Sequence, residues 1–373
     1  MHAAGDPASP VRYSRHRKSF RPVAGDLHAG WHDWLSEGHL AGALVLPCSD
    51  DALEFVAHQR ADMLAQGLVP MEADDGAVLA MLDKDRTYEV ARAAGIAAPR
   101  TVRLHDQEDL ERAIDEIGLP CALKPVHIHE FARHFRRKAI VARDANALRA
   151  AFATTDRLGV AMILTEIVPG AEDRYCSYFT FVTPDGGFLF DFTKRKLRQY
   201  PPGFGGGTYH LTEWADDVAE AGRRFLEAAG VRGLANVEFK RDPRDGELKL
   251  IECNVRFTAA NEIVRRAGID IAWIVYMRMT GRPVGNIGRG RDGVRMWYPV
   301  QDTMAFLETR RAGELTLGAW GRSLAHRQTF PLWAATDPLP SLMEMGSVPR
   351  RVLGKVRARR DPSRSSSPDA ALR

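Results

Sequence analysis

The stretch LANVEFKRDPRDGELKLIECNVRF, residues 234–257, carries two runs of alternating residue types on either side of the turn sequence at residues 243–246. This pattern predicts an antiparallel hairpin. Side chains alternate across a strand, so Glu252, Asn254 and Arg256 share one face of the second run. The apolar residues expected on the other face are Ile251, Cys253 and Val255. One face is therefore core and the other a chemical site, with a half-solvated edge strand as the alternative.

Two glutamates of this hairpin predict a metal site. A turn at residues 243–246 puts Asn236 roughly opposite Glu252 and Glu238 one diagonal step away. Carboxylates that close repel each other unless a cation lies between them. Oxygen ligands favour Mg²⁺ or Mn²⁺, and Mg²⁺ fills its remaining positions with water and substrate phosphate. We therefore expect Glu238, Glu252 and Asn254 to bind a metal, and Arg256 to contact a phosphate or a substrate carboxylate.

The composition is that of a soluble globular protein. The 373 residues are 45% hydrophobic and 27% charged, and no apolar run approaches the roughly 18 residues needed to cross a bilayer. The first residues, MHAAGDPASPVRYSRHRKSF, lack the apolar segment of a signal peptide, so we expect a cytoplasmic protein. The net charge of +4 gathers in basic ends without interleaved aromatic residues, so we expect no nucleic-acid partner and no membrane partner.

Periodicity and turn residues predict a chain of mixed α and β structure. Residues 42–72 fit a strand, an amphipathic helix and a second strand, and the chain is expected to enter the fold at SFRPV, residues 19–23, which is interpreted as the second strand of its domain. Asp83 is expected to cap a helix that runs from Lys84 to about Ala94. The other predicted strands are CALKPV, RKAIVAR, MILTEIVPG and the two runs of a hairpin that turns at residues 184–187.

Two basic segments suggest contacts with an anion. Lys124 stands in the apolar run CALKPV, where a buried ammonium needs an anionic partner, unless its stem carries the charge to water. The segment TKRKLRQYPPGFGGGTYH places four basic residues before a glycine-rich loop. This loop is interpreted either as a mobile lid over a site or as a plain flexible loop.

A further segment, TEIVPGAED, suggests contacts with a nucleoside. Extended backbone at Glu166, Ile167 and Val168 can present N–H and C=O groups to an adenine edge. The acidic residues that follow, Glu172 and Asp173, are candidates for binding ribose hydroxyl groups.

Taken in chain order, MLDKDRTYEVARAAGIAAPRT, GLPCALKPV, LTEIVPGAED, FDFTKRKLRQYPP and the hairpin of residues 234–257 resemble the ATP-grasp carboxylate–amine ligases. The likeness runs from about residue 41 to residue 283. Within the family, the sequence is most similar to the branch of uncharacterised enzymes that resemble D-aspartate ligase. The resemblance implies an α+β ATP-grasp fold, with two α+β subdomains clasping ATP after a shortened α/β N-terminal domain.

The domain boundaries follow from the same resemblance. The shortened N-terminal domain is expected at residues 1–80 and the ATP-grasp domain at residues 81–285. The latter divides into a lid subdomain at about 100–170 and a metal-binding subdomain at about 171–285. Residues 286–360 form a C-terminal extension without a readable pattern, and residues 361–373 are rich in Ser and Pro and expected to be disordered.

The resemblance also implies roles for individual residues. Lys84 and Lys124 would face the phosphates, residues 166–168 would meet adenine, and Lys138 would replace a glycine-rich lid that the segment HIHEFARHFRRK lacks. The residues that match the family's magnesium ligands are Glu238, Glu252 and Asn254. The residues expected near the transferred phosphoryl group are Lys194, Arg195, Lys196 and Arg256.

The implied reaction is an ATP- and Mg²⁺-dependent (or Mn²⁺-dependent) ligation. A carboxylate takes the γ-phosphoryl group to form an acyl phosphate, and an amine then displaces phosphate to leave an amide or peptide bond. The expected partners are small carboxylate and amine substrates and a second copy of the chain in a homodimer. The alternative is a catalytically inactive ATP-binding protein of the same fold. A bicarbonate-using carboxylase would need an acceptor site for which we find no residues.

Overall fold

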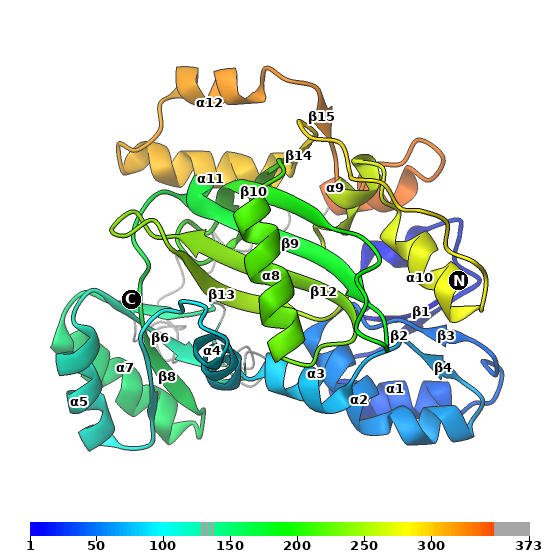
Figure 1. Cartoon of the computed structure of the whole chain (residues 1–373), viewed down its shortest axis with the longest axis horizontal. Helices are drawn as coiled ribbons and strands as arrows, with labels where there is room; N and C mark the ends of the chain where they lie inside the picture. The colour runs from blue at the N-terminus through cyan, green and yellow to red at the C-terminus, as the bar shows by residue number, and fades with distance from the viewer. Residues whose placement is uncertain (128–130, 132–133, 136–137, 347–373) are drawn as a thin grey trace.

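The computed structural model describes residues 1–127, 131, 134–135 and 138–346 (Figure 1). The expected disordered tail, residues 361–373, and part of the segment HIHEFARHFRRK lie outside this description. None of the helices formed by the described residues is both long and apolar enough to span a lipid bilayer.

The first part of the chain contains two small parallel sheets. β1 (His2–Gly5) pairs with β2 (Ser19–Pro22), and β3 (Leu44–Val45) pairs with β4 (Val69–Pro70). α2 (Asp50–Ala65) connects β3 to β4, which confirms the predicted strand–helix–strand unit. SFRPV contains β2, and the expectation that the chain enters the fold at this strand is wrong, because β1 precedes it and supplies its backbone partners. The other elements of this part are η1 (Pro10–Tyr13), α1 (Leu27–Leu35) and α3 (Asp75–Leu82).

A four-stranded antiparallel sheet, in the order β5-β8-β6-β7, forms the second part. Its elements, with the helix that leads into it, are α4 (Lys84–Ala93), β5 (Thr101–Leu104), α5 (Gln107–Ile117), β6 (Cys121–Pro125), β7 (Ile140–Ala142), α7 (Ala145–Arg157) and β8 (Met162–Glu166). Asp83 caps α4 as predicted, since its carboxylate accepts from the backbone N–H groups of Asp85 and Arg86. α5 and α7 pack on the sheet through a core that includes Leu110, Leu123, Leu148 and Phe152.

The largest unit is a seven-stranded sheet in the order β13-β12-β9-β10-β11-β14-β15. Its strands, with one short helix, are η2 (Glu172–Arg174), β9 (Tyr175–Val182), β10 (Phe192–Tyr200), β11 (Gly206–Thr212), β12 (Gly233–Arg241), β13 (Leu248–Asn254), β14 (Arg295–Trp297) and β15 (Gln328–Thr329). α8 (Asp216–Ala228) lies across one face of this sheet (Figure 1). A Cβ at Gly222 of α8 would lie 2.4 Å from the Tyr178 ring, so glycine permits this close packing. The opposite face carries polar residues and, further along the strands, a second apolar core that includes Phe179, Phe181 and Phe192.

Two hairpins build the centre of this sheet. The predicted turn at residues 184–187 is confirmed, because β9 and β10 pair antiparallel on either side of it. The segment TKRKLRQYPPGFGGGTYH forms a second hairpin, in which β10 pairs antiparallel with β11. Its glycine-rich loop is therefore held between two paired strands.

The chain beyond residue 285, which the sequence leaves uninterpreted, joins the large sheet through β14 and β15. Asp302 is fully buried and accepts hydrogen bonds from Arg198 Nε (2.8 Å), Thr208 Oγ1 (2.9 Å), Trp297 Nε1 (3.0 Å) and Trp320 Nε1 (2.9 Å). This buried ion pair fixes the extension to β10 and β11. The helices of the extension are α11 (Pro299–Arg311) and α12 (Leu317–Leu324), and α9 (Asn261–Arg266) and α10 (Ile271–Met279) precede it.

Candidate functional site

The register of β12 and β13 places Glu238 directly opposite Glu252. The prediction that Asn236 faces Glu252 is wrong, because Asn236 pairs with Asn254 instead. Directly opposite residues of an antiparallel pair share a face of the sheet. The two carboxylates and the two amides therefore form consecutive pairs on one face.

A β-bulge in β13 causes this difference. Phe239 pairs with Leu250 and Glu238 with Glu252, so Ile251 is an extra residue without a cross-strand partner. Leu250 is fully buried in the core, while Ile251, which simple alternation assigns to the core, is only half-buried. The expectation that Ile251 packs in the core is therefore wrong.

Charged residues form a row across four neighbouring strands. In the register, Lys194 of β10 lies opposite Ser177 of β9, Ser177 opposite Glu238 of β12, and Glu238 opposite Glu252 of β13. Lys194 Nζ donates to Ser177 Oγ over 3.1 Å. Lys196 Nζ, two residues further along β10, lies 2.9 Å from Glu238 Oε1. Lys194 and Lys196 are almost fully buried, so this row concentrates charge away from water.

The oxygen atoms around the glutamate pair fit a magnesium ion. Asn254 Nδ2 donates to Glu252 Oε1 over 3.1 Å, which leaves the Asn254 carbonyl oxygen available as a ligand. Asn236 Oδ1 is buried, and no residue in the described part of the chain donates a hydrogen bond to it. Among the described residues no group of three His, Cys, Asp or Glu side chains could hold a metal, so the candidate set is two carboxylates with amide oxygens. Mg²⁺ prefers such a set of hard oxygen ligands with water and phosphate completing it.

The electrostatic surroundings keep Glu252 ionised. Burial by itself raises the pKa of a carboxyl group. Here the positive charges of Lys138 and Lys196 and the hydrogen bond from Asn254 outweigh burial and lower the pKa of Glu252 to about 2. The carboxylate is therefore negative at neutral pH, as a metal ligand must be.

Two further lysines reach the same region from the second part of the chain. Burial and the charge of Lys84 lower the pKa of Lys124 to about 8. Burial also lowers the pKa of Lys84, although Glu252 and Asp50 act in the opposite direction. Lys124 Nζ lies 5.8 Å from the centre of the Phe204 ring in the β10–β11 loop. Within the described ranges neither lysine forms an ion pair, so both are suited to binding an anion such as a phosphate.

The first part of the chain also reaches the site. Arg256 Nε lies 2.6 Å from Asp50 Oδ1, at the start of α2. Asp50 lines a pocket together with Lys84, Glu252 and Asn254. The planar fork of Arg256 is thus already engaged by a carboxylate, and it lies beside the glutamate pair.

One predicted site residue, Arg195, points away from the glutamate pair. Arg195 lies between Lys194 and Lys196 in β10, so strand alternation turns it to the opposite face of the sheet. Its Nε is 3.0 Å from Glu213 Oε2. Arg195 is therefore not part of the lysine group, and its assignment near the transferred phosphoryl group is withdrawn.

The two acidic residues expected at the ribose, Glu172 and Asp173, have different surroundings in the structure. Glu172 accepts hydrogen bonds from the backbone N–H groups of Gln199 (2.9 Å) and Gly203 (3.0 Å). Its carboxylate therefore fastens the β10–β11 loop instead of presenting free oxygens. Asp173 is exposed and stays a candidate for binding hydroxyl groups.

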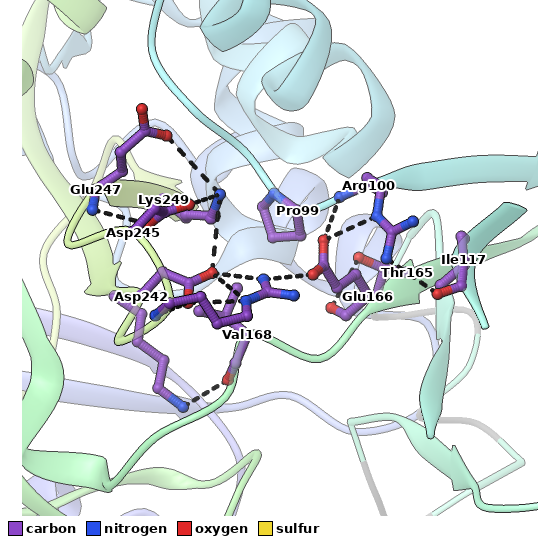
Figure 2. Close-up of polar contacts among 12 residues, drawn as sticks. Pro99, Arg100, Ile117, Thr165, Glu166, Val168, Asp242, Asp245, Glu247 and Lys249 are labelled. Carbon is purple, nitrogen blue, oxygen red and sulfur yellow. Dashed lines mark hydrogen bonds and ion pairs between the residues drawn. The ribbon is translucent and has the colours of Figure 1, made fainter. Parts of the chain in front are cut away.

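The segment expected to meet adenine is only partly free (Figure 2). The Glu166 carboxylate accepts from the backbone N–H and Nε of Arg100 (3.2 and 3.3 Å) and from Arg244. The Val168 carbonyl accepts from Lys240 Nζ (2.8 Å). Among the described residues, the backbone N–H groups of Ile167 and Val168 have no acceptor. Within the same part of the chain no donor reaches the Ile167 carbonyl either, so both donors and an acceptor are left for a ligand.

Comparison with known proteins supports this picture. No protein-family model matches the chain. It is 23% identical over 285 residues to a D-aspartate ligase of Enterococcus faecium, covering 73% of this chain and 67% of that one. It is 27% identical over 245 residues to a D-alanine–D-alanine ligase of Xanthomonas axonopodis, covering 58% and 71%. A similar solved structure is the biotin carboxylase domain of a Hydrogenobacter thermophilus 2-oxoglutarate carboxylase, in complex with MgADP, ADP and bicarbonate. The TM-score is 0.61 at 16% identity, over 79% of this chain and 67% of that one.

These findings show that the chain shares its fold with ATP-grasp proteins. The predicted α+β ATP-grasp fold is confirmed. The particular likeness by sequence is to carboxylate–amine ligases, and the resemblance expected from the sequence is confirmed as well.

Several residues of the site are absent from the sequence-based set. Asn236 and Lys240 flank Glu238 at spacing two in ANVEFKR, a signal that could have placed both on the same face. Ser177 and Arg244 carry no such signal, because they become site residues only through contacts distant in the sequence. Ser177 lies opposite Lys194 of β10, and Arg244 donates to Glu166 of β8.

Proposed function

We propose that the chain is an ATP- and Mg²⁺-dependent ligase that joins a carboxylate to an amine through an acyl phosphate. The observation that carries this proposal is the row formed by Glu238, Glu252 and the two buried lysines Lys194 and Lys196 on one face of the large sheet. Adjacent carboxylates suit a metal that binds a triphosphate, and adjacent cations suit a phosphoryl group in transfer.

Each group has a place in this reaction. Glu238, Glu252 and Asn254 would hold Mg²⁺, which neutralises charge on phosphate oxygens when bound. Lys84 and Lys124 would contact the phosphates, because they are cations without a carboxylate partner among the described residues. These side chains position and stabilise charge and form no covalent bond with the substrate.

The chemistry has two steps. A substrate carboxylate oxygen attacks the γ-phosphorus of ATP, and the bond to the bridging oxygen breaks to release ADP. A neutral amine then attacks the acyl carbon, phosphate leaves, and the nitrogen loses a proton to give the amide. Lys194 and Lys196, which contact Ser177 and Glu238 in the same row, would stabilise the oxygens of the transferred group in both steps.

The substrates proposed are amino acids, since D-aspartate ligase and D-alanine–D-alanine ligase are among the curated relatives. Arg256 and Asp50 lie next to the pocket beside Glu252 and are the candidates for binding the charged groups of such a substrate. A cytoplasmic location and a homodimer complete the proposal. The dimeric state of one similar structure supports the homodimer.

Release of ADP tests the proposal directly. Purified protein with ATP and Mg²⁺ is supplied with D-aspartate, D-alanine and pools of other amino acids, alone and in pairs. We expect ADP formation that requires both a carboxylate and an amine and that stops when Mg²⁺ is chelated. Binding of ATP without any substrate-dependent ADP would instead identify an inactive ATP-binding protein.

A further inference from the structure

Lys240 of β12 connects the metal hairpin to the segment that follows β8. It lies two residues after Glu238 and therefore on the same face of the strand. Its side chain is 6% exposed, and its Nζ donates to the carbonyls of Val168 (2.8 Å) and Gly170 (2.9 Å). A buried ammonium that satisfies two carbonyls of an irregular segment fixes the path of that segment.

A second tie joins the same two elements. Arg244, in the β12–β13 turn, donates to Glu166 at the end of β8 and to the fully buried Asp242. Glu166 also accepts from Arg100, at the entry to β5 (Figure 2). The end of β8 is thus held from the turn of the hairpin as well as from its own sheet.

These contacts decide which backbone groups remain free. Lys240 already donates to the Val168 carbonyl, so this oxygen has one lone pair left for a ligand. The N–H groups of Ile167 and Val168 have no acceptor within the described part of the chain. Lys240 therefore fixes a segment whose backbone donors are available to an approaching ring edge.

We propose that Lys240 is a positioning residue for the nucleotide base. It holds residues 166–170 so that their backbone donors read the base, and it sets the distance between the base and the metal ligand Glu238 on the same strand. This inference rests on the proposed function, in which residues 166–168 meet adenine. It adds that base recognition and metal binding are coupled through one strand.

The test compares three variants by calorimetric titration with MgATP, MgGTP and inorganic tripolyphosphate. Lys240→Met removes both donated hydrogen bonds, and Lys240→Arg keeps a cationic donor. Arg241→Met is the matched control, because Arg241 follows Lys240 in the same strand and pairs with Asp217 instead of with residues 166–170. Thermal unfolding is followed for each variant.

We expect Lys240→Met to raise the Kd for ATP roughly tenfold or more, the usual effect of losing charge-assisted hydrogen bonds. The ratio of GTP to ATP affinity should move toward one, while tripolyphosphate binding stays unchanged. Lys240→Arg should recover most of the ATP affinity, and Arg241→Met should bind all three ligands like the wild type. If Lys240→Met does not fold, Arg244→Gln removes the second tie, and the same base-dependent loss is expected from it.

Two results overturn the inference while leaving the proposed function intact. One is wild-type ATP affinity and wild-type base preference in Lys240→Met, or in Arg244→Gln where that variant replaces it. The other is an equal loss of ATP, GTP and tripolyphosphate affinity, which indicates general damage and no role at the base. A wild-type protein that binds none of the three ligands would remove the proposed function itself, and the inference with it.

Discussion

Glu238 and Glu252 lie directly opposite each other on β12 and β13, and the bulge at Ile251 brings them to one face of the sheet. Without the extra residue, the pairing of Phe239 with Leu250 would continue as Glu238 with Ile251. Glu252 would then turn to the opposite face, because a shift of one residue reverses every side chain that follows. The bulge therefore creates the paired carboxylates on which the metal site depends.

Replacing Glu252 by Gln should impair magnesium use far more than folding. The pair would lose one of its two charges, so we expect the Mg²⁺ concentration for half-maximal ADP release to rise at least about tenfold. Glu247→Gln is the control, because Glu247 is 61% exposed in the same hairpin. A Glu252→Gln protein that melts far below the wild type but has normal activity per folded molecule would make Glu252 a structural residue.

Lys196 and Arg195 offer a comparison of neighbouring cations on opposite faces of β10. Lys196→Met should lower kcat/KM at least about a hundredfold, since removal of one preorganised donor to a developing charge has effects of that size. Arg195→Met, which removes an exposed cation, should stay within about twofold. Steady-state ADP release gives both values. Equal losses in the two variants would contradict the assignment by face.

The affinity for ATP should fall as pH rises above about 8. Burial and Lys84 lower the pKa of Lys124 to about 8, so its ammonium is charged below that pH and neutral above it. A phosphate binds the charged form. Above the pKa, loss of this one proton lowers the affinity by up to about tenfold for each pH unit. Titrations with ATP from about pH 7 to about pH 9 measure this slope.

Lys124→Arg tests the origin of that slope, because arginine stays protonated in this range. The slope should become shallower without vanishing, since burial also lowers the pKa of Lys194 to about 8. An unchanged slope in Lys124→Arg would show that Lys124 does not contact the nucleotide.

Asp302 should be important for stability. It is fully buried and neutralises Arg198, so Asp302→Ala leaves a nearly buried guanidinium without a counter-ion. We expect a loss of about 3–5 kcal/mol in the free energy of unfolding, measured by urea denaturation. Asp292→Ala, at an exposed position of the same extension, should change it by less than about 0.5 kcal/mol. A loss below about 1 kcal/mol for Asp302→Ala would contradict the role of this ion pair.

Much of the fold could be predicted because its signals are local. Asp83 caps α4, and alternating runs around residues 184–187 and 243–246 form the hairpins expected from them. The extension beyond residue 285 could not be interpreted, since β14 and β15 are short strands that exist only by pairing with the sheet.

For the candidate site too, some features could be predicted from local sequence signals and others could not. Glu252 and Asn254 stand in one strand, so their alternation in the sequence places them on one face, whereas Glu238 is brought opposite Glu252 by the bulge at Ile251. Alternation along β10 puts Arg195 on the opposite face from Lys194 and Lys196. This signal could be applied only once the bounds of the strand were known. Glu172 fits a ribose ligand in the sequence, but its carboxylate is used by the β10–β11 loop.

The sequence by itself determined the class of fold, the hairpin that carries the carboxylates and the chemistry those oxygens favour, because periodicity and residue type act over a few residues. Only the tertiary structure decided the register across the bulge at Ile251, the partners of Lys196 and Glu166, and the contact of Lys240 with Val168 and Gly170. These contacts join residues far apart in the chain, and their geometry depends on how the sheets pack against one another.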